Sequence, residues 1–110
     1  MEKLFSFTIV GNDGAHFDRN NIITTVTLYD TRVVVESVVK SGNFICQQIR
    51  SVHLLKHMVG VETLIINNGL KENIDVILGL TSPYKIFSAP ATEENLAIIK
   101  QFLAILERLL

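Results

Sequence analysis

The stretch Thr92–Leu110, TEENLAIIKQFLAILERLL, predicts an amphipathic helix at the end of the chain. Thr92 is a favourable N-cap, and Glu93 and Glu94 place negative charge in the first turn, where the helix dipole favours it. At about 100° per residue, the apolar side chains fill a continuous arc of roughly 180°. In order around the helix they are Ile105, Ile98, Leu109, Phe102, Leu106, Ile99, Leu110, Leu103 and Leu96. A helix packed on a core needs a stripe of about 100° or somewhat more, so this helix offers more apolar surface than a simple lid requires.

The sequence ahead of this helix is typical of β-strands. In the first segment, Phe5, Phe7 and Ile9 alternate with hydroxyl side chains, as expected for a strand with one buried face. Later segments are rich in β-branched residues, which pack well on a pleated sheet. Seven strands are predicted, namely Leu4–Val10, Ile22–Tyr29, Arg32–Val39, Phe44–Leu55, Val61–Asn67, Ile74–Leu80 and Tyr84–Ala89. Antiparallel strands at this spacing predict a sandwich or barrel, and the helix is suited to close its open end.

The segment Phe44–Leu55 departs from regular alternation. Gln47 and Gln48 interrupt its apolar residues, which then resume out of step. A β-bulge or strong bend near Gln48 would reconcile the two halves. Cys46, the chain's one cysteine, lies in this segment, and we expect a buried, inert thiol there. A single cysteine forms no internal disulfide and fits a reducing compartment.

The composition predicts one compact domain covering residues 1–110. Hydrophobic residues make up 48% and charged residues 19%, which allows a core and argues against disorder. A net charge of −1 and a pI near 6.3 argue against a nucleic-acid-binding protein, which normally carries a basic stripe. The sequence shows no signal peptide and no stretch apolar enough to span a bilayer, so we expect a cytoplasmic protein.

Three local patterns resemble the bacterial pleckstrin-homology-like (PH-like) domain family. Val26–Glu36 (VTLYDTRVVVE) resembles the family's hairpin, in which a threonine-containing strand is followed by a turn, an arginine and an apolar run. Gln48–Val52 (QIRSV) is similar to a central segment of these domains, and Val59–Ile66 (VGVETLII) is similar to the glycine and apolar strand that follow it. With the last helix, the resemblance covers Ile22–Leu110. It implies a mainly β fold, a seven-stranded antiparallel PH-like barrel capped by one C-terminal helix.

The wider superfamily also implies phosphoinositide binding. Its lipid-binding members use several basic residues around the first strand and the loop that follows. Here the corresponding segment, Gly11–Asn21, has balanced charge and no Lys/Arg cluster to pair with phosphate oxygens. Membrane lipid is therefore an alternative partner and not the favoured one.

A second candidate site is a basic group made of Arg50, His53, Lys56 and His57. On a helix, two histidines four residues apart could share a metal ion. The pattern places His53 on a strand and His57 in the following turn, where this spacing does not converge, so we expect no metal site. The four residues stay a candidate contact for an anion or a partner.

The C-terminal helix is the main candidate for function. The candidate interface residues are Ile98, Ile99, Phe102, Leu103, Ile105, Leu106, Leu109 and Leu110. Either the barrel absorbs the whole apolar arc, or one margin stays exposed and contacts a second copy or a protein partner. No nucleophile–base pair or paired carboxylates indicate an enzyme, and no cofactor is expected. The sequence thus predicts a non-enzymatic binding or scaffolding module that self-associates, as a homo-oligomer, or binds a protein partner. The alternative is a peripheral lipid or membrane-surface binding domain.

Overall fold

The computed structural model describes residues 2–12, 21–67, 72–79 and 83–110. Over these residues the chain is mainly β, with strands followed by one C-terminal helix, and the predicted order of elements is confirmed. The strands are β1 (Lys3–Asn12), β2 (Asn21–Tyr29), β3 (Arg32–Ser41), β4 (Phe44–Leu54), β5 (Gly60–Asn67), β6 (Glu72–Gly79) and β7 (Pro83–Pro90). A short 3₁₀ helix, η1 (Leu55–His57), joins β4 to β5, and α1 (Glu93–Leu109) follows β7. Most of the predicted loop Gly11–Asn21, and the predicted strand end Leu80, lie outside the described residues.

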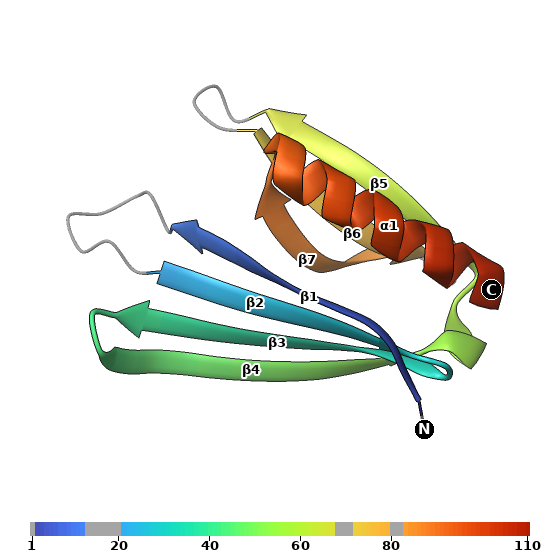
Figure 1. The fold of residues 1–110 in the computed structure, drawn as a ribbon, viewed down its shortest axis with the longest axis horizontal. Helices are drawn as coiled ribbons and strands as arrows, with labels where there is room; N and C mark the ends of the chain where they lie inside the picture. Colours follow the sequence, from blue (N-terminus) through green and yellow to red (C-terminus); the bar gives the residue numbers. More distant parts are fainter. Residues whose placement is uncertain (1, 13–20, 68–71, 80–82) are drawn as a thin grey trace.

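The strands form two antiparallel sheets (Figure 1). One sheet has the order β1-β2-β3-β4, and the other has the order β5-β6-β7. In the described part of the chain no strand pairing joins the two sheets, so the closed barrel that the sequence led us to expect is not observed. The connection after β4 gives the physical reason. There η1 turns the chain, the Leu55 N–H donates to the Thr31 carbonyl oxygen (3.0 Å), and β5 then starts a second sheet.

Tight turns make the larger sheet a meander. Asp30 and Thr31 alone connect β2 to β3, as the sequence predicted for a hairpin. Gly42 and Asn43 connect β3 to β4, and Gly42 has a φ of 61°, which glycine adopts without the steric cost that a Cβ would bring.

The core lies between the sheets and beneath the helix. The side chains that are fully buried come from both sheets and from α1; they are Phe102, Leu28, Ile74, Leu106, Val26, Val33 and Val76. Three phenylalanine rings meet at its centre, from β1 (Phe7), β7 (Phe87) and α1 (Phe102). Their centroids are 5.4 Å apart for Phe7 and Phe102, 5.7 Å for Phe7 and Phe87, and 6.2 Å for Phe87 and Phe102, all in edge-to-face geometry. Edge-to-face aromatic pairs add stability beyond the area that they bury.

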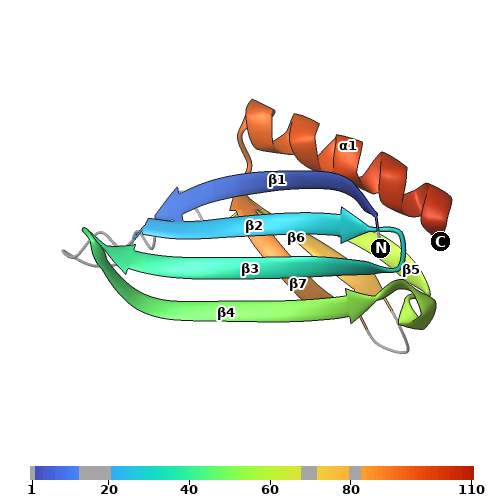
Figure 2. The same cartoon turned by 60° about the horizontal axis from the view of Figure 1, so that its bottom comes forward.

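Helix α1 lies along the β1 side of the larger sheet (Figure 2). Its predicted N-cap is confirmed, since the Asn95 N–H donates to Thr92 Oγ1 (3.2 Å). The Asn95 side-chain amide also donates to the Pro90 carbonyl oxygen (2.9 Å), which ties the start of the helix to the end of β7. The sequence at Pro90–Asn95 therefore fixes where the helix leaves the sheet.

We expect Phe102→Ala to lower the free energy of unfolding by about 3–5 kcal/mol, because it leaves a cavity between the two sheets and the helix. Urea unfolding followed by circular dichroism measures this loss. Gln101→Ala is the matched control, since Gln101 is exposed one residue away, and its effect should stay within about 0.5 kcal/mol. Equal losses in the two variants would contradict this packing.

Candidate interaction surface

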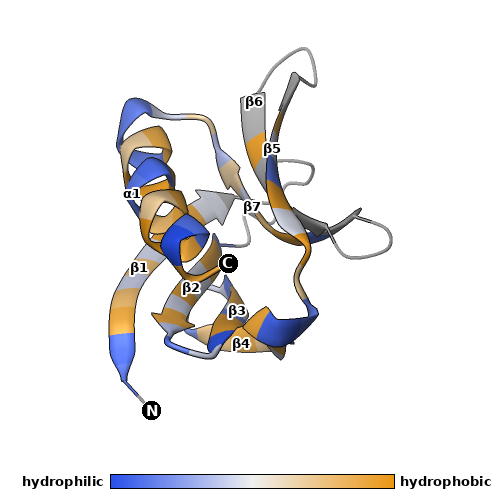
Figure 3. Ribbon diagram, turned by 90° about the vertical axis from the view of Figure 1, so that its right-hand side faces the viewer, coloured by the Kyte–Doolittle hydropathy of each residue, from blue (hydrophilic) through white to orange (hydrophobic). Residues whose placement is uncertain are grey.

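The apolar arc of α1 is buried at its centre and exposed at both margins. Ile99, Phe102 and Leu106 are buried in the core. Ile98 and Ile105 on one margin, and Leu103 on the other, are half-buried. The exposed arc residues are Leu96 (39%), Leu109 (37%) and Leu110 (47%). Seen from the end of the helix (Figure 3), α1 lies to one side of both sheets, so the centre of its arc faces the core.

Three of the eight candidate interface residues on the helix are therefore core residues in this structure. The sheets cover neither margin of the arc completely, so both margins keep residues that are half-buried or exposed. The residues left at the surface, Leu96, Leu109 and Leu110, are spread along the helix.

A larger exposed apolar surface lies on β4. This strand is one of the two edge strands of its sheet, the other being β1, and every residue from Phe44 to Arg50 is exposed. We define the β4 surface as the five large apolar side chains exposed along it: Phe44 (71%), Ile49 (51%), Ile45 (47%), Val52 (39%) and Leu54 (38%). Ile49 lies on one face of the strand and Val52 on the other, so these side chains gather along the edge of the sheet and not in one flat patch. Exposed apolar side chains along an edge strand are candidates for an interaction site.

A bulge divides β4 into two parts. The register with β3 pairs Gln47 with Val39 but Ile45 with Lys40, so Cys46 is the extra residue. The predicted irregularity is confirmed, two residues before Gln48. The prediction of a buried thiol is wrong, because Cys46 is exposed. A residue at a bulge on an outermost strand has no second strand to cover it.

The register also fixes which face each β4 side chain occupies. His53 and Ile49 pair with Val33 and Ser37, which lie on the face of the sheet that contains the core. Arg50 pairs with Glu36 on the opposite face. Ile49 is nevertheless 51% exposed, because the strand lies at the edge of its sheet.

The predicted basic group is divided by this arrangement. Arg50 and His53 lie on opposite faces of β4, while Lys56 and His57 are exposed on η1. Arg50 is thus directed away from the face that carries His53.

His53 has a half-buried imidazole in a polar contact. Its Nε2 lies 3.2 Å from the Ser51 hydroxyl on the same face of the strand. Burial removes water from the ring and disfavours the charged form, which lowers the pKa of His53 from its usual 6.5.

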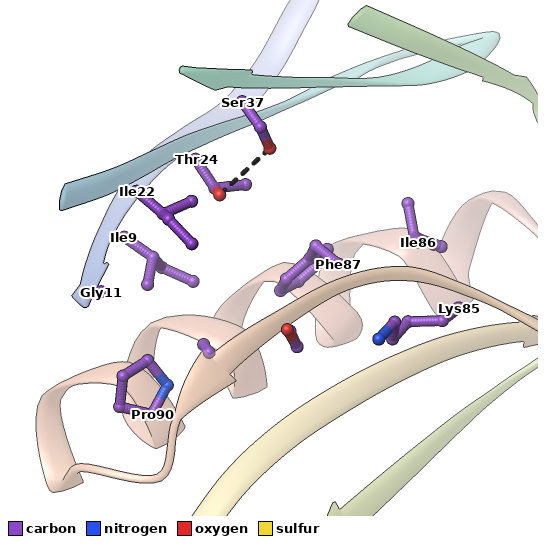
Figure 4. Close-up of a pocket in the computed structure, with 11 residues that line it drawn as sticks. Ile9, Gly11, Ile22, Thr24, Ser37, Lys85, Ile86, Phe87 and Pro90 are labelled. Atoms are coloured by element: carbon purple, nitrogen blue, oxygen red, sulfur yellow. Dashed lines mark hydrogen bonds between the residues drawn. The ribbon is translucent and has the colours of Figure 1, made fainter. Parts of the chain in front are cut away.

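A cleft of about 270 Å³ opens between β7 and the larger sheet (Figure 4). Ile9 and Thr24 line one side, and Phe87 lies on the other. Thr24 Oγ1 and Ser37 Oγ lie 3.2 Å apart and hydrogen-bond to each other, so the two hydroxyl groups satisfy one another. Over the described residues, no buried side-chain polar atom lacks a hydrogen-bond partner. Lys85 and Ser88 also line the cleft and are exposed, so its lining is partly apolar and partly polar.

A wider hollow of about 590 Å³ lies at the C-terminal end of α1. Its lining residues are Asp30, Thr31, Leu54, Leu55, Lys56, Met58, Leu109 and Leu110. Leu54, at the end of the β4 surface, therefore lines the same hollow as Leu109 and Leu110 at the end of the helix.

Sequence reasoning placed the candidate interface on the helix and missed the β4 surface. The pattern of Phe44–Leu55 predicts a strand with imperfect alternation, and a strand pattern does not tell which of its faces a second layer covers. One signal was available. Apolar residues on both faces of the strand, Ile49 on one and Val52 on the other, together with polar Gln47 and Gln48, are not typical of a strand buried on one side.

Side chains that could bind a metal ion do not gather in the part of the chain that the structure describes. Among the residues that it describes, no three His, Cys, Asp or Glu side chains come close enough to hold a metal ion. None of its described helices has the length and apolarity needed to cross a membrane. Comparison of the chain with models of known protein families, with curated proteins and with solved structures finds no match.

The lowered pKa of His53 predicts a pH dependence of stability. The unfolded chain binds a proton at this residue more readily than the folded chain does, so the free energy of unfolding should fall as the pH decreases through about 6.5. Thermal unfolding between about pH 7.5 and 5.5 measures the slope, and His53→Gln should reduce it. The same slope in both proteins would show that this imidazole is not the group responsible.

Proposed function

We propose that this protein is a non-enzymatic binding or scaffolding module that self-associates or binds a protein partner. We further propose that its fold is PH-like, with the barrel left open between its two sheets. Within the residues that the structure describes, four features support the PH-like assignment: seven strands in chain order, a four-stranded and a three-stranded antiparallel sheet, one C-terminal helix, and a core shared by all three.

The β4 surface carries the functional part of the proposal. A sheet edge presents backbone N–H and C=O groups that another chain can pair with, and monomeric proteins usually protect such edges with Lys, Pro or short strands. The edge strand here spans eleven residues, Phe44–Leu54, and contains neither Lys nor Pro; the bulge at Cys46 and the charge of Arg50 are the protective features that it has. Its exposed side chains are largely apolar, which favours a protein partner over solvent.

The helix has a secondary role in this proposal. Most of its apolar arc is used in the core, and two of the residues that stay exposed, Leu109 and Leu110, line the same hollow as Leu54 at the end of β4. The exposed end of the helix would thus extend the contact area that β4 begins.

We expect the purified protein to have a mass above that of the monomer at high micromolar concentration, measured by size-exclusion chromatography with light scattering. Ile49→Glu should shift it toward the monomer, because the change places a charge at the centre of the β4 surface. Leu96→Glu is the matched control, because it also replaces an exposed apolar side chain with a charged one. Leu96 lies on α1, away from β4. A wild-type monomer throughout the concentration range would contradict self-association.

The alternative, binding at a lipid surface, has a separate test. Lys100 and Arg108 are the exposed cations of α1, and Glu107 lies beside Arg108, so the helix offers little attraction to anionic lipid. We expect the protein to stay in the supernatant when vesicles of anionic phospholipid are sedimented. Co-sedimentation that is lost at high salt would favour the lipid alternative.

A further inference from the structure

Strand β4 is suited to pair with a copy of itself. Two identical edge strands that meet antiparallel are related by a two-fold axis perpendicular to the sheet, and this axis passes beside one residue that faces its own copy. With Ile49, the middle residue of Phe44–Leu54, at this axis, the regular segment that follows the bulge, Gln47–Ser51, pairs with its own copy.

The side chains agree with this register. With Ile49 at the axis, Gln48 faces Arg50 of the second copy on one side of the sheet, and Gln47 faces Ser51 on the other side. Gln48, Arg50 and Gln47 are exposed, so they are accessible to a second copy. Opposed polar pairs of this kind contribute favourably across strands. At the axis itself, Ile49 meets an apolar side chain identical to its own.

Charge disfavours the neighbouring register. Arg50 is the only Lys, Arg, Asp or Glu residue in Phe44–Leu54. A two-fold axis at Arg50 would place two guanidinium groups directly opposite one another, and like charges in that position are destabilising. Moving the axis to Ile49 separates the two arginines and gives each one a glutamine amide oxygen as acceptor.

We propose that β4 pairs antiparallel with β4 of a second copy of this chain, with Ile49 at the two-fold axis, so that the four-stranded sheets of the two copies form one continuous sheet. This inference rests on the proposed function and names its partner and surface. The bulge at Cys46 marks where regular pairing ends on each side, because the extra residue interrupts the spacing of backbone hydrogen bonds.

Charge substitutions at Gln48 test the register. Gln48→Glu places a carboxylate opposite Arg50 of the second copy at two symmetric positions, and we expect the dimer dissociation constant to decrease about fivefold. Gln48→Arg places like charges there, and we expect the constant to increase by at least about fivefold. Gln101→Glu and Gln101→Arg are matched controls on the exposed face of α1, and they should leave the dimer unchanged.

Disulfide trapping tests the position of the axis. In a Cys46→Ser background, Ile49→Cys should form a covalent dimer under mild oxidation, because opposed residues have Cα atoms about 4.5–5.5 Å apart, within disulfide range. Gln47→Cys in the same background is the control. It lies on the same face, but its own copy is displaced by four residues along the strand, about 13 Å away.

The outcomes separate this inference from the proposed function. A dimer that is trapped through position 49, and not through position 47, and that responds in opposite directions to the two Gln48 changes supports the paired strands. A dimer without that trapping overturns the β4 pairing and leaves self-association standing. A protein that is monomeric throughout overturns both.

Discussion

The contact among Phe7, Phe87 and Phe102 is the interaction on which the rest of the structure depends. Each ring comes from a different layer: the four-stranded sheet, the three-stranded sheet and the helix. Because no described strand pairing joins the two sheets, backbone hydrogen bonds stabilise each sheet internally but do not hold one to the other. That task falls to buried apolar side chains, which contribute about 25 cal/mol for each Å² removed from water.

The open arrangement accounts for both unusual surfaces. The helix covers one side of the space between the sheets, and it uses the centre of its arc to do so, which leaves partly exposed residues on either margin. On the opposite side, the chain turns through η1 instead of pairing β4 with β5, so β4 keeps a free edge. The exposed margins of the helix and the free edge of β4 therefore both follow from one feature, the separation of the described strands into two sheets.

Local elements were predictable from the sequence, and their assembly was not. Alternation identified β1, and Thr92 with its acidic neighbours identified the start of α1, because these signals depend on residues close in sequence. Barrel closure requires β4 to pair with β5 and β7 to pair with β1, and a period of two says nothing about which strands become neighbours. The prediction that Cys46 is buried failed for the same reason. Its surroundings are those of a strand, but only the sheet order shows that this strand lies at an edge.

The order of strands also has a consequence for how the chain folds. In each sheet every strand pairs with its neighbour in sequence, and two of the turns in the larger sheet contain only two residues. Strand pairing therefore closes short loops at small entropic cost, and such local contacts form early. The contact between Phe7 and Phe102, residues near opposite ends of the chain, must form across almost its whole length. We therefore expect each sheet to form from local contacts, and the joining of the two sheets across longer sequence separations to limit the rate of folding.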